Sequence, residues 1–296
     1  MVFSQNEIES YSMNDLYAID PRAPRGLSEI KILSDLFGFS HGRFIARYPN
    51  DWEKLLSARR NELSDNDNAR LTILIKRLSE NTIPLSEVYR MNQDWLANVL
   101  KVEDKEKKFK KVVCQRDIDN NHISMNKFLY EQDIPDARGD HVRADVKTYQ
   151  QLITPLFLVS TEIHIQDMYF YFFDRGRRLN RSYRVLKMFL HTASLGARCE
   201  KLIFHLNGEK FDSDCLERKL QDDLMQAAQE CGCTNIEMEY SLEDRRLTHG
   251  RYVFSIKGGL QFDHGFDIAN RESARLNHVH WLSEGELTPL WDRYGI

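Results

Sequence analysis

The chain has 296 residues, of which 42% are hydrophobic and 29% charged, and its net charge is -4. This length predicts two domains rather than one. No run of about 18 apolar residues is present, so we expect no membrane-spanning helix, and the acidic balance excludes a protein that is coated in basic surface. The first residues, MVFSQNEIESYSMNDLY, lack the basic start and apolar core of a secretory signal.

The five cysteines are scattered through the sequence, and only Cys231 and Cys233 lie close together. A lone Cys-x-Cys is too sparse for a structural zinc site. We therefore expect reduced thiols and a cytoplasmic protein, because disulfides rarely persist in that compartment.

The first third of the chain has the spacing of helices. Apolar residues recur at intervals of three and four in the segments 51–63, 68–81 and 85–102. A lysine-rich segment follows at 102–113, which we interpret as a solvated helix or linker face. Turn-forming residues then dominate 117–141. The prediction is a helical N-terminal domain over 1–125 and a second domain over 126–296.

The second domain alternates strands with helices. The expected helices cover 145–160, with Asp145 as the cap, 181–196 and 212–232. The expected strands cover 162–173, 200–206 and 235–241. The segments 251–256 and 259–266 flank a Lys-Gly-Gly turn as a hairpin. This order predicts an α/β fold with a largely parallel sheet for the second domain. Together with the helical N-terminal domain, the whole chain is then expected to be α+β.

Two motifs resemble the phospholipase D-like superfamily, and more narrowly a bacterial branch that is similar to the C-terminal domain of MIT-domain proteins. The first is EIHIQDMYF at 162–170, and the second is HGRYVFSIKGGLQFDHGFD at 249–267. The resemblance covers roughly 145–267 and implies a mixed-sheet α/β domain. It also implies a bacterial accessory protein of an anti-phage or mobile-element system.

The resemblance assigns roles to residues of the second motif. His249 matches the histidine that attacks phosphorus in active members, and a neutral imidazole is a competent nucleophile near neutral pH. Arg251 stands where the motif usually has lysine, and either cation holds phosphate oxygens. The aspartate of the motif falls at Ile256, which cannot orient an imidazole. The motif is therefore incomplete.

Active members of the superfamily combine two such motifs, so that a second histidine protonates the leaving oxygen. Here the second could come from a homodimer, from His41-Gly42-Arg43, or from His264 across the hairpin. Asp167, in an otherwise apolar strand, either points into a site at the end of the strand or is paired internally. We interpret His164 and Gln166 as ordinary alternating residues.

A basic stripe follows the first strand of the motif. Helical spacing places Leu179, Tyr183, Leu186 and Leu190 on one side and Arg177, Arg181, Arg184 and Lys187 on the other. Arginines beyond the carboxyl end of a strand suit a phosphate backbone, and Lys257 adds a further cation to the predicted site. A solvated face without a ligand is the alternative.

The sequence contains no Walker loop, dinucleotide glycine fingerprint or His-Glu-x-x-His motif. His278 and His280 are two residues apart, so they share a strand face, but no third ligand is near them in the sequence. We therefore expect no metal and no cofactor.

Three functions fit these observations. The expected one is a module that recognises a phosphodiester, as in nucleic acid, or a partner protein, with a degenerate catalytic motif. The second is an active phosphodiesterase or nuclease with His249 as nucleophile in a homodimer. The third is an assembly subunit whose N-terminal domain docks a larger complex.

Overall fold

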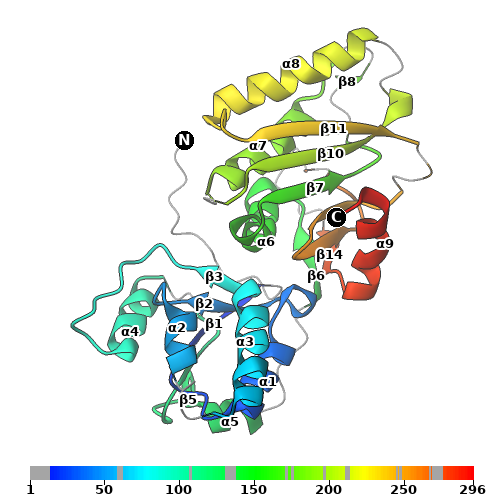
Figure 1. Ribbon diagram of the computed structural model, residues 1–296. Helices are drawn as coiled ribbons and strands as arrows, with labels where there is room; N and C mark the ends of the chain where they lie inside the picture. Colours follow the sequence, from blue (N-terminus) through cyan, green and yellow to red (C-terminus); the bar gives the residue numbers. More distant parts are fainter. Residues whose placement is uncertain are drawn as a thin grey trace. The chain divides into compact units, whose positions relative to one another are not determined.

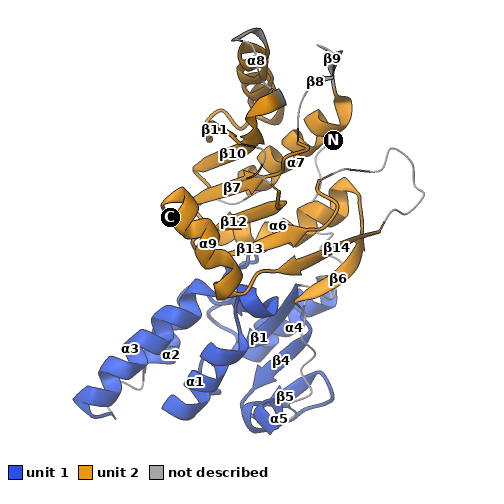
Figure 2. Ribbon diagram, turned by 90° about the vertical axis from the view of Figure 1, so that its right-hand side faces the viewer, with its two compact units in different colours: residues 1–137 blue, residues 138–296 orange. Residues whose placement is uncertain are grey.

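The structure is a computed structural model, which describes residues 14–58, 63–106, 109–130, 138–170, 173–174, 177–195, 198–210, 214–244, 246, 249–266, 268 and 276–296. The chain divides into two compact units, 1–137 and 138–296 (Figure 2). Both units have helices packed on a sheet, so the protein has an α/β fold. Among the described helices, none combines the length and the apolar character needed to cross a bilayer.

The first unit is built on a parallel sheet of five strands, in the order β3-β2-β1-β4-β5. The strands are β1 (Asp15–Ile19), β2 (Arg43–Arg47), β3 (Thr82–Pro84), β4 (Lys111–Cys114) and β5 (His122–Ser124), and every pair is parallel. The chain winds outward from β1 in one direction and then returns to continue from its other side. This order creates a switch point between β1 and β4.

Helices cover both faces of this sheet (Figure 1). One face packs on α1 (Leu27–Leu36), α2 (Trp52–Leu56), α3 (Asp65–Glu80) and α5 (Met125–Tyr130), and the other on α4 (Trp95–Glu106). Strand β1 serves both cores by alternation, with Tyr17 and Ile19 facing the first and Ala18 the second.

The prediction of a helical N-terminal domain is therefore wrong. The helices α2, α3 and α4 lie within or overlap the predicted helical segments, but the short strands of the sheet were missed. A strand of three to five residues that is buried on both faces has no polar alternation to reveal it.

The division between the units also lies further along the chain than the predicted boundary at 125/126. Strand β5 pairs with β4, and Met125 and Phe128 of the following helix are buried in the first core. The turn-forming residues before them are thus a connection inside the first unit.

The second unit contains a mixed sheet of seven strands, in the order β11-β10-β7-β12-β13-β14-β6. The strands are β6 (Gly139–Arg143), β7 (Glu162–Gln166), β10 (Lys201–Asn207), β11 (Glu237–Glu243), β12 (Tyr252–Ser255), β13 (Gly258–Phe262) and β14 (Leu276–Trp281). The neighbouring pairs β11–β10 and β10–β7 are parallel, whereas β12, β13, β14 and β6 pair antiparallel to their neighbours. The expected hairpin is confirmed as β12 and β13.

The helices of this unit are α6 (Val146–Val159), α7 (Asn180–Leu195), α8 (Asp214–Cys231) and α9 (Glu284–Tyr294). Helix α6 begins where expected, because the Asp145 side chain accepts a hydrogen bond of 2.8 Å from the amide of Thr148. Helices α6 and α7 pack on one face of the sheet, where Tyr149 contacts Phe262. Helix α9 packs on the other face, where Leu287 and Phe254 share a core (Figure 2).

Candidate phosphate-binding site

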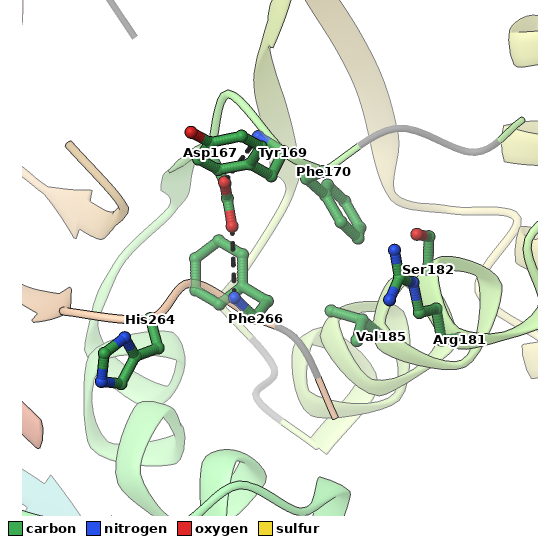
Figure 3. A pocket seen from close by; sticks show the side chains of 8 residues that line it. All are labelled: Asp167, Tyr169, Phe170, Arg181, Ser182, Val185, His264 and Phe266. Atoms are coloured by element: carbon green, nitrogen blue, oxygen red, sulfur yellow. Dashed lines mark hydrogen bonds between the residues drawn. The ribbon is translucent and has the colours of Figure 1, made fainter. Parts of the chain in front are cut away.

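The site is organised by Asp167, which directly follows β7 and is 3% exposed. One carboxylate oxygen accepts a hydrogen bond of 2.8 Å from the amide of Tyr169, and the other accepts one of 3.2 Å from the amide of Phe266 (Figure 3). The first bond and the backbone bond from Phe170 to Asp167 turn the chain away from the sheet. Strand β7 therefore ends at Gln166, earlier than the predicted 173. The aspartate lines a cavity and is also paired internally, so the two expected arrangements do not exclude each other.

The turn 263–266 is held against this carboxylate by a glycine. Gly265 has a φ of +72°, and a Cβ on it would lie 2.5 Å from Oδ2 of Asp167. Asn277 of β14 supports the turn from behind, accepting from the amide of His264 and donating to the carbonyl of Gly265. Only a residue without a side chain fits this close approach.

Arg251 connects the carboxylate to the same turn. Its Nε lies 3.9 Å from Oδ1 of Asp167, and its Nη1 donates a hydrogen bond to the carbonyl of Asp263. Its guanidinium lies over the ring of Tyr169, 5.0 Å from the centroid. Because Tyr169 is 52% exposed, an arginine and an aromatic face lie together at the surface.

A cavity of about 180 Å³ opens beside Asp167. It is lined by Asp167, Tyr169, Phe170, Arg181, Ser182, Val185, His264 and Phe266. Figure 3 shows Arg181 and Ser182 reaching in from the first turn of α7 and His264 on the other side. A guanidinium, a hydroxyl and an imidazole therefore line one cavity. The cavity also lies at a helix N-terminus, where backbone amides favour binding of an anion.

His249 does not join this group. It is exposed, and the described residues that line the cavity do not include it. The two-residue spacing of His249 and Arg251 would place both side chains on one face if a single strand included both residues. Strand β12 begins only at Tyr252, so alternation does not extend back to His249.

Ile256 and Lys257 lie at the other end of β12 from Arg251. Because β12 runs antiparallel to β7, Tyr252 pairs with Gln166 beside the site, while the turn after Ser255 lies at the opposite end of the strand. Ile256 is 55% exposed there. The expectation that Lys257 and Arg251 serve one site is therefore wrong, since about four residues of extended strand separate them.

The basic stripe on α7 is divided. Tyr183, Leu186 and Leu190 are buried as predicted, and Arg181 and Arg184 are exposed. Lys187 forms an ion pair of 3.1 Å with Glu230 of α8, so it serves the packing of two helices. The side chain of Arg177 lies outside what the structure describes. Of the cations of this stripe whose side chains the structure describes, Arg181 alone lines the cavity.

The opposite face of the sheet carries a buried polar group that the sequence interpretation missed. Nδ1 of His164 lies 2.9 Å from Nε2 of His205, and the outer nitrogens face Glu162 at 2.8 Å and Glu243 at 3.5 Å. The ring of Tyr294, from α9, lies 3.8 Å from the ring of His205. A histidine in each of two neighbouring apolar strands was the signal available in the sequence.

Burial decides the protonation of this pair. It lowers the pKa of His164, and together with the neighbouring imidazole it lowers the pKa of His205 to about 4. Both rings are therefore neutral at pH 7. Two neutral imidazoles supply only two protons for these three contacts, and Nδ1 of His205 makes no hydrogen bond among the described residues.

A second feature that the sequence interpretation missed lies in the first unit. Asp20 directly follows β1, at the carboxyl edge of the parallel sheet next to the switch point, and is 4% exposed. Its carboxylate accepts three hydrogen bonds from Arg22, at 2.9, 3.1 and 3.2 Å. This arrangement accounts for its burial as an internal ion pair.

The sequence matches no protein-family model. It also matches no curated protein.

Proposed function

We propose that the second unit binds a phosphodiester group of single-stranded nucleic acid in the cavity beside Asp167. The single observation that carries the proposal is that Arg181, Ser182 and His264 all line one cavity at the N-terminus of α7. Guanidinium, hydroxyl and backbone amide groups are the usual partners of phosphate oxygens.

The size of the cavity favours one group of a longer chain. Pockets that enclose whole drug-sized ligands have volumes of about 300–1,000 Å³, and this cavity has about 180 Å³. A phosphate with part of its sugar fills such a space while the rest of the polymer lies outside.

The exposed ring of Tyr169 supports a single strand rather than a duplex. Bases of single-stranded nucleic acid stack on aromatic side chains, and neighbouring arginines add to this binding. Tyr169 lies at the rim of the cavity with Arg251 on its face. A base next to the bound phosphate would stack on the ring of Tyr169.

Fluorescence anisotropy with labelled single-stranded DNA, duplex DNA and RNA tests the proposal, with titrations at about 50 and 200 mM salt. We expect single strands to bind more tightly than the duplex, and binding to weaken as salt rises. Arg181→Glu should weaken binding at least tenfold and reduce the salt slope by about one. Arg184→Glu is the matched control, because it makes the same charge change on the same helix outside the cavity.

Each outcome decides one point. Equal loss in both variants would assign binding to the helix face instead of the cavity. Absence of binding at low salt would overturn the proposal and favour a protein partner. Cleavage products on a denaturing gel would support the alternative of an active phosphodiesterase, which requires that His249→Ala abolish them.

A further inference from the structure

A cluster of two histidines and one aspartate lies at the end of the β13–β14 ladder. Asp263 directly follows β13, and its amide donates a hydrogen bond of 3.0 Å to the carbonyl of His278. His278 and His280 are two residues apart on β14, so their side chains leave the same face of the strand. The antiparallel register thus supplies the third residue that was missing from the sequence pattern.

The donor atoms of these three residues are close together. One ligand atom from each lies within 4.8 Å of the other two, and Nδ1 of His278 is 3.2 Å from Oδ2 of Asp263. On the neighbouring strand β6, Gly139 leaves this face open: a Cβ there would lie 3.0 Å from Cβ of His280 and 3.3 Å from Nε2 of His278.

The orientation of His280 provides a second, independent observation. Its Nε2 lies 3.7 Å from Oε1 of Glu286, in the first turn of α9. Its Nδ1 is buried and makes no hydrogen bond within the described part of the chain. A histidine that binds a metal through one nitrogen commonly donates its other N–H to a carboxylate. Nδ1 is therefore the nitrogen available for an ion.

We propose that Asp263, His278 and His280 bind one divalent transition-metal ion, with Zn²⁺ the best match to two imidazoles and a carboxylate. Tetrahedral coordination with bonds of about 2.0–2.2 Å places ligand atoms roughly 3.3 Å apart. The Asp263–His278 distance of 3.2 Å already meets this requirement. The other ligand atoms must come closer to one another by at most about 1.5 Å, and small rotations of the side chains are enough for this. Three protein ligands leave a fourth position open.

This site is distinct from the phosphate-binding cavity, although Asp263 adjoins both. Its carbonyl accepts from Arg251, whereas its carboxylate faces His278. An ion would anchor the start of the turn that carries His264. The two proposals are separable, because nucleic-acid binding measured in the presence of EDTA reports on the cavity alone.

Isothermal titration of metal-free protein with Zn²⁺ tests the metal site. The protein should carry Cys231→Ser and be kept reduced, so that this half-exposed thiol does not compete for zinc. We expect one tight site per chain, at least about a hundredfold weaker in His280→Ala and in Asp263→Asn. Glu286→Gln should weaken it by about 10–100-fold, as the loss of an outer-shell partner does.

The control is His249→Ala, which removes an exposed histidine of the same unit and should leave the zinc affinity unchanged. Circular dichroism and melting without metal establish that each variant is folded, and zinc should raise the Tm of the parent but not of His280→Ala. Zinc binding of equal strength in the parent and in folded His280→Ala would overturn the proposal. So would an equal loss in His249→Ala.

Discussion

The imidazoles of His164 and His205 lie with their planes 5° apart, and Nδ1 of the first is 2.9 Å from Nε2 of the second. Both rings are nearly inaccessible to solvent, at 3% exposure each. Glu162 and Glu243 face the outer nitrogens, and Tyr294 covers the ring of His205. A buried pair of this kind makes stability depend on pH.

Acidification should destabilise the second unit through this pair. Because the pKa of His205 is about 4 in the folded state and near 6.5 when unfolded, the unfolded chain binds an extra proton between these values. The stabilisation that the neutral His205 ring gives the folded state is complete above pH 6.5 and is lost as the pH falls towards 4. The expected loss is about 2 kcal/mol between pH 7 and pH 5.

Urea unfolding at a series of pH values measures this effect in the parent, in His205→Gln and in His264→Gln. The first variant should have a flatter dependence between pH 5 and pH 7, and the second, which removes an exposed histidine, should follow the parent. Parallel curves for the parent and His205→Gln would show that the buried pair does not titrate in this window.

Gly265→Ala should destabilise the protein by about 2–4 kcal/mol, because it adds steric overlap with Asp167 to the strain of a positive φ. The matched control is Gly232→Ala. Gly232 also has a positive φ, +67°, but a Cβ there meets nothing within 4 Å, so only about 1 kcal/mol is expected. Chemical denaturation of both variants measures the difference. Equal losses would mean that the turn relaxes around the added methyl group.

Asp167→Asn should lower the free energy of unfolding by about 1–3 kcal/mol and weaken nucleic-acid binding. The two carboxylate oxygens of Asp167 each accept a hydrogen bond from a backbone amide. In the variant, an amide nitrogen replaces one oxygen, so a buried donor faces another donor. The turn that carries His264 then loses its anchor. Asp292→Asn, an exposed position on α9, is the control for the same chemical change. Unfolding and anisotropy titrations together check the result, and unaltered binding in a folded Asp167→Asn variant would count against the role assigned to this carboxylate.

Tyr169→Ala should weaken binding of single-stranded oligonucleotides by about tenfold while leaving the duplex unaffected, since loss of one stacked base costs about 1–3 kcal/mol. Tyr169→Phe keeps the stacking surface and should retain affinity. Anisotropy titration measures all three proteins. Equal effects on single strands and duplex would argue against stacking at this ring.

Ile256→Asp should not create a phosphodiesterase, although it completes the sequence motif. The side chain is 55% exposed at the end of β12 remote from Arg251, so a carboxylate there cannot orient an imidazole at the cavity. Hydrolysis of bis-(p-nitrophenyl) phosphate should stay at background, and stability should change by no more than about 0.5 kcal/mol. Turnover in this variant that depends on His249 would contradict the arrangement described above.

Local sequence determined much of the second unit. Three local signals predicted α6, α7, α8, β10, β11 and the β12–β13 hairpin. They are the Asp145 cap, the alternation of apolar strands with amphipathic helices, and the Lys-Gly-Gly turn, and each of them determines structure within a few residues of its own position. Local rules failed in the first unit. Strands β1, β2 and β4 are largely buried on both faces, so their segments carry no period that distinguishes them from the neighbouring helices. Strands β3 and β5 have only three residues each, too few to show a period.

The composition of each site was decided only by the tertiary structure. Arg251 and Asp167 meet because β12 lies antiparallel beside β7, and the same pairing carries Ile256 and Lys257 to the far end of the strand. Asp263 joins His278 and His280 because a hairpin register brings distant residues together. Spacing along the sequence specifies which side chains share a strand face, but strand order and register specify which strands are neighbours, and these depend on the packing of the whole sheet.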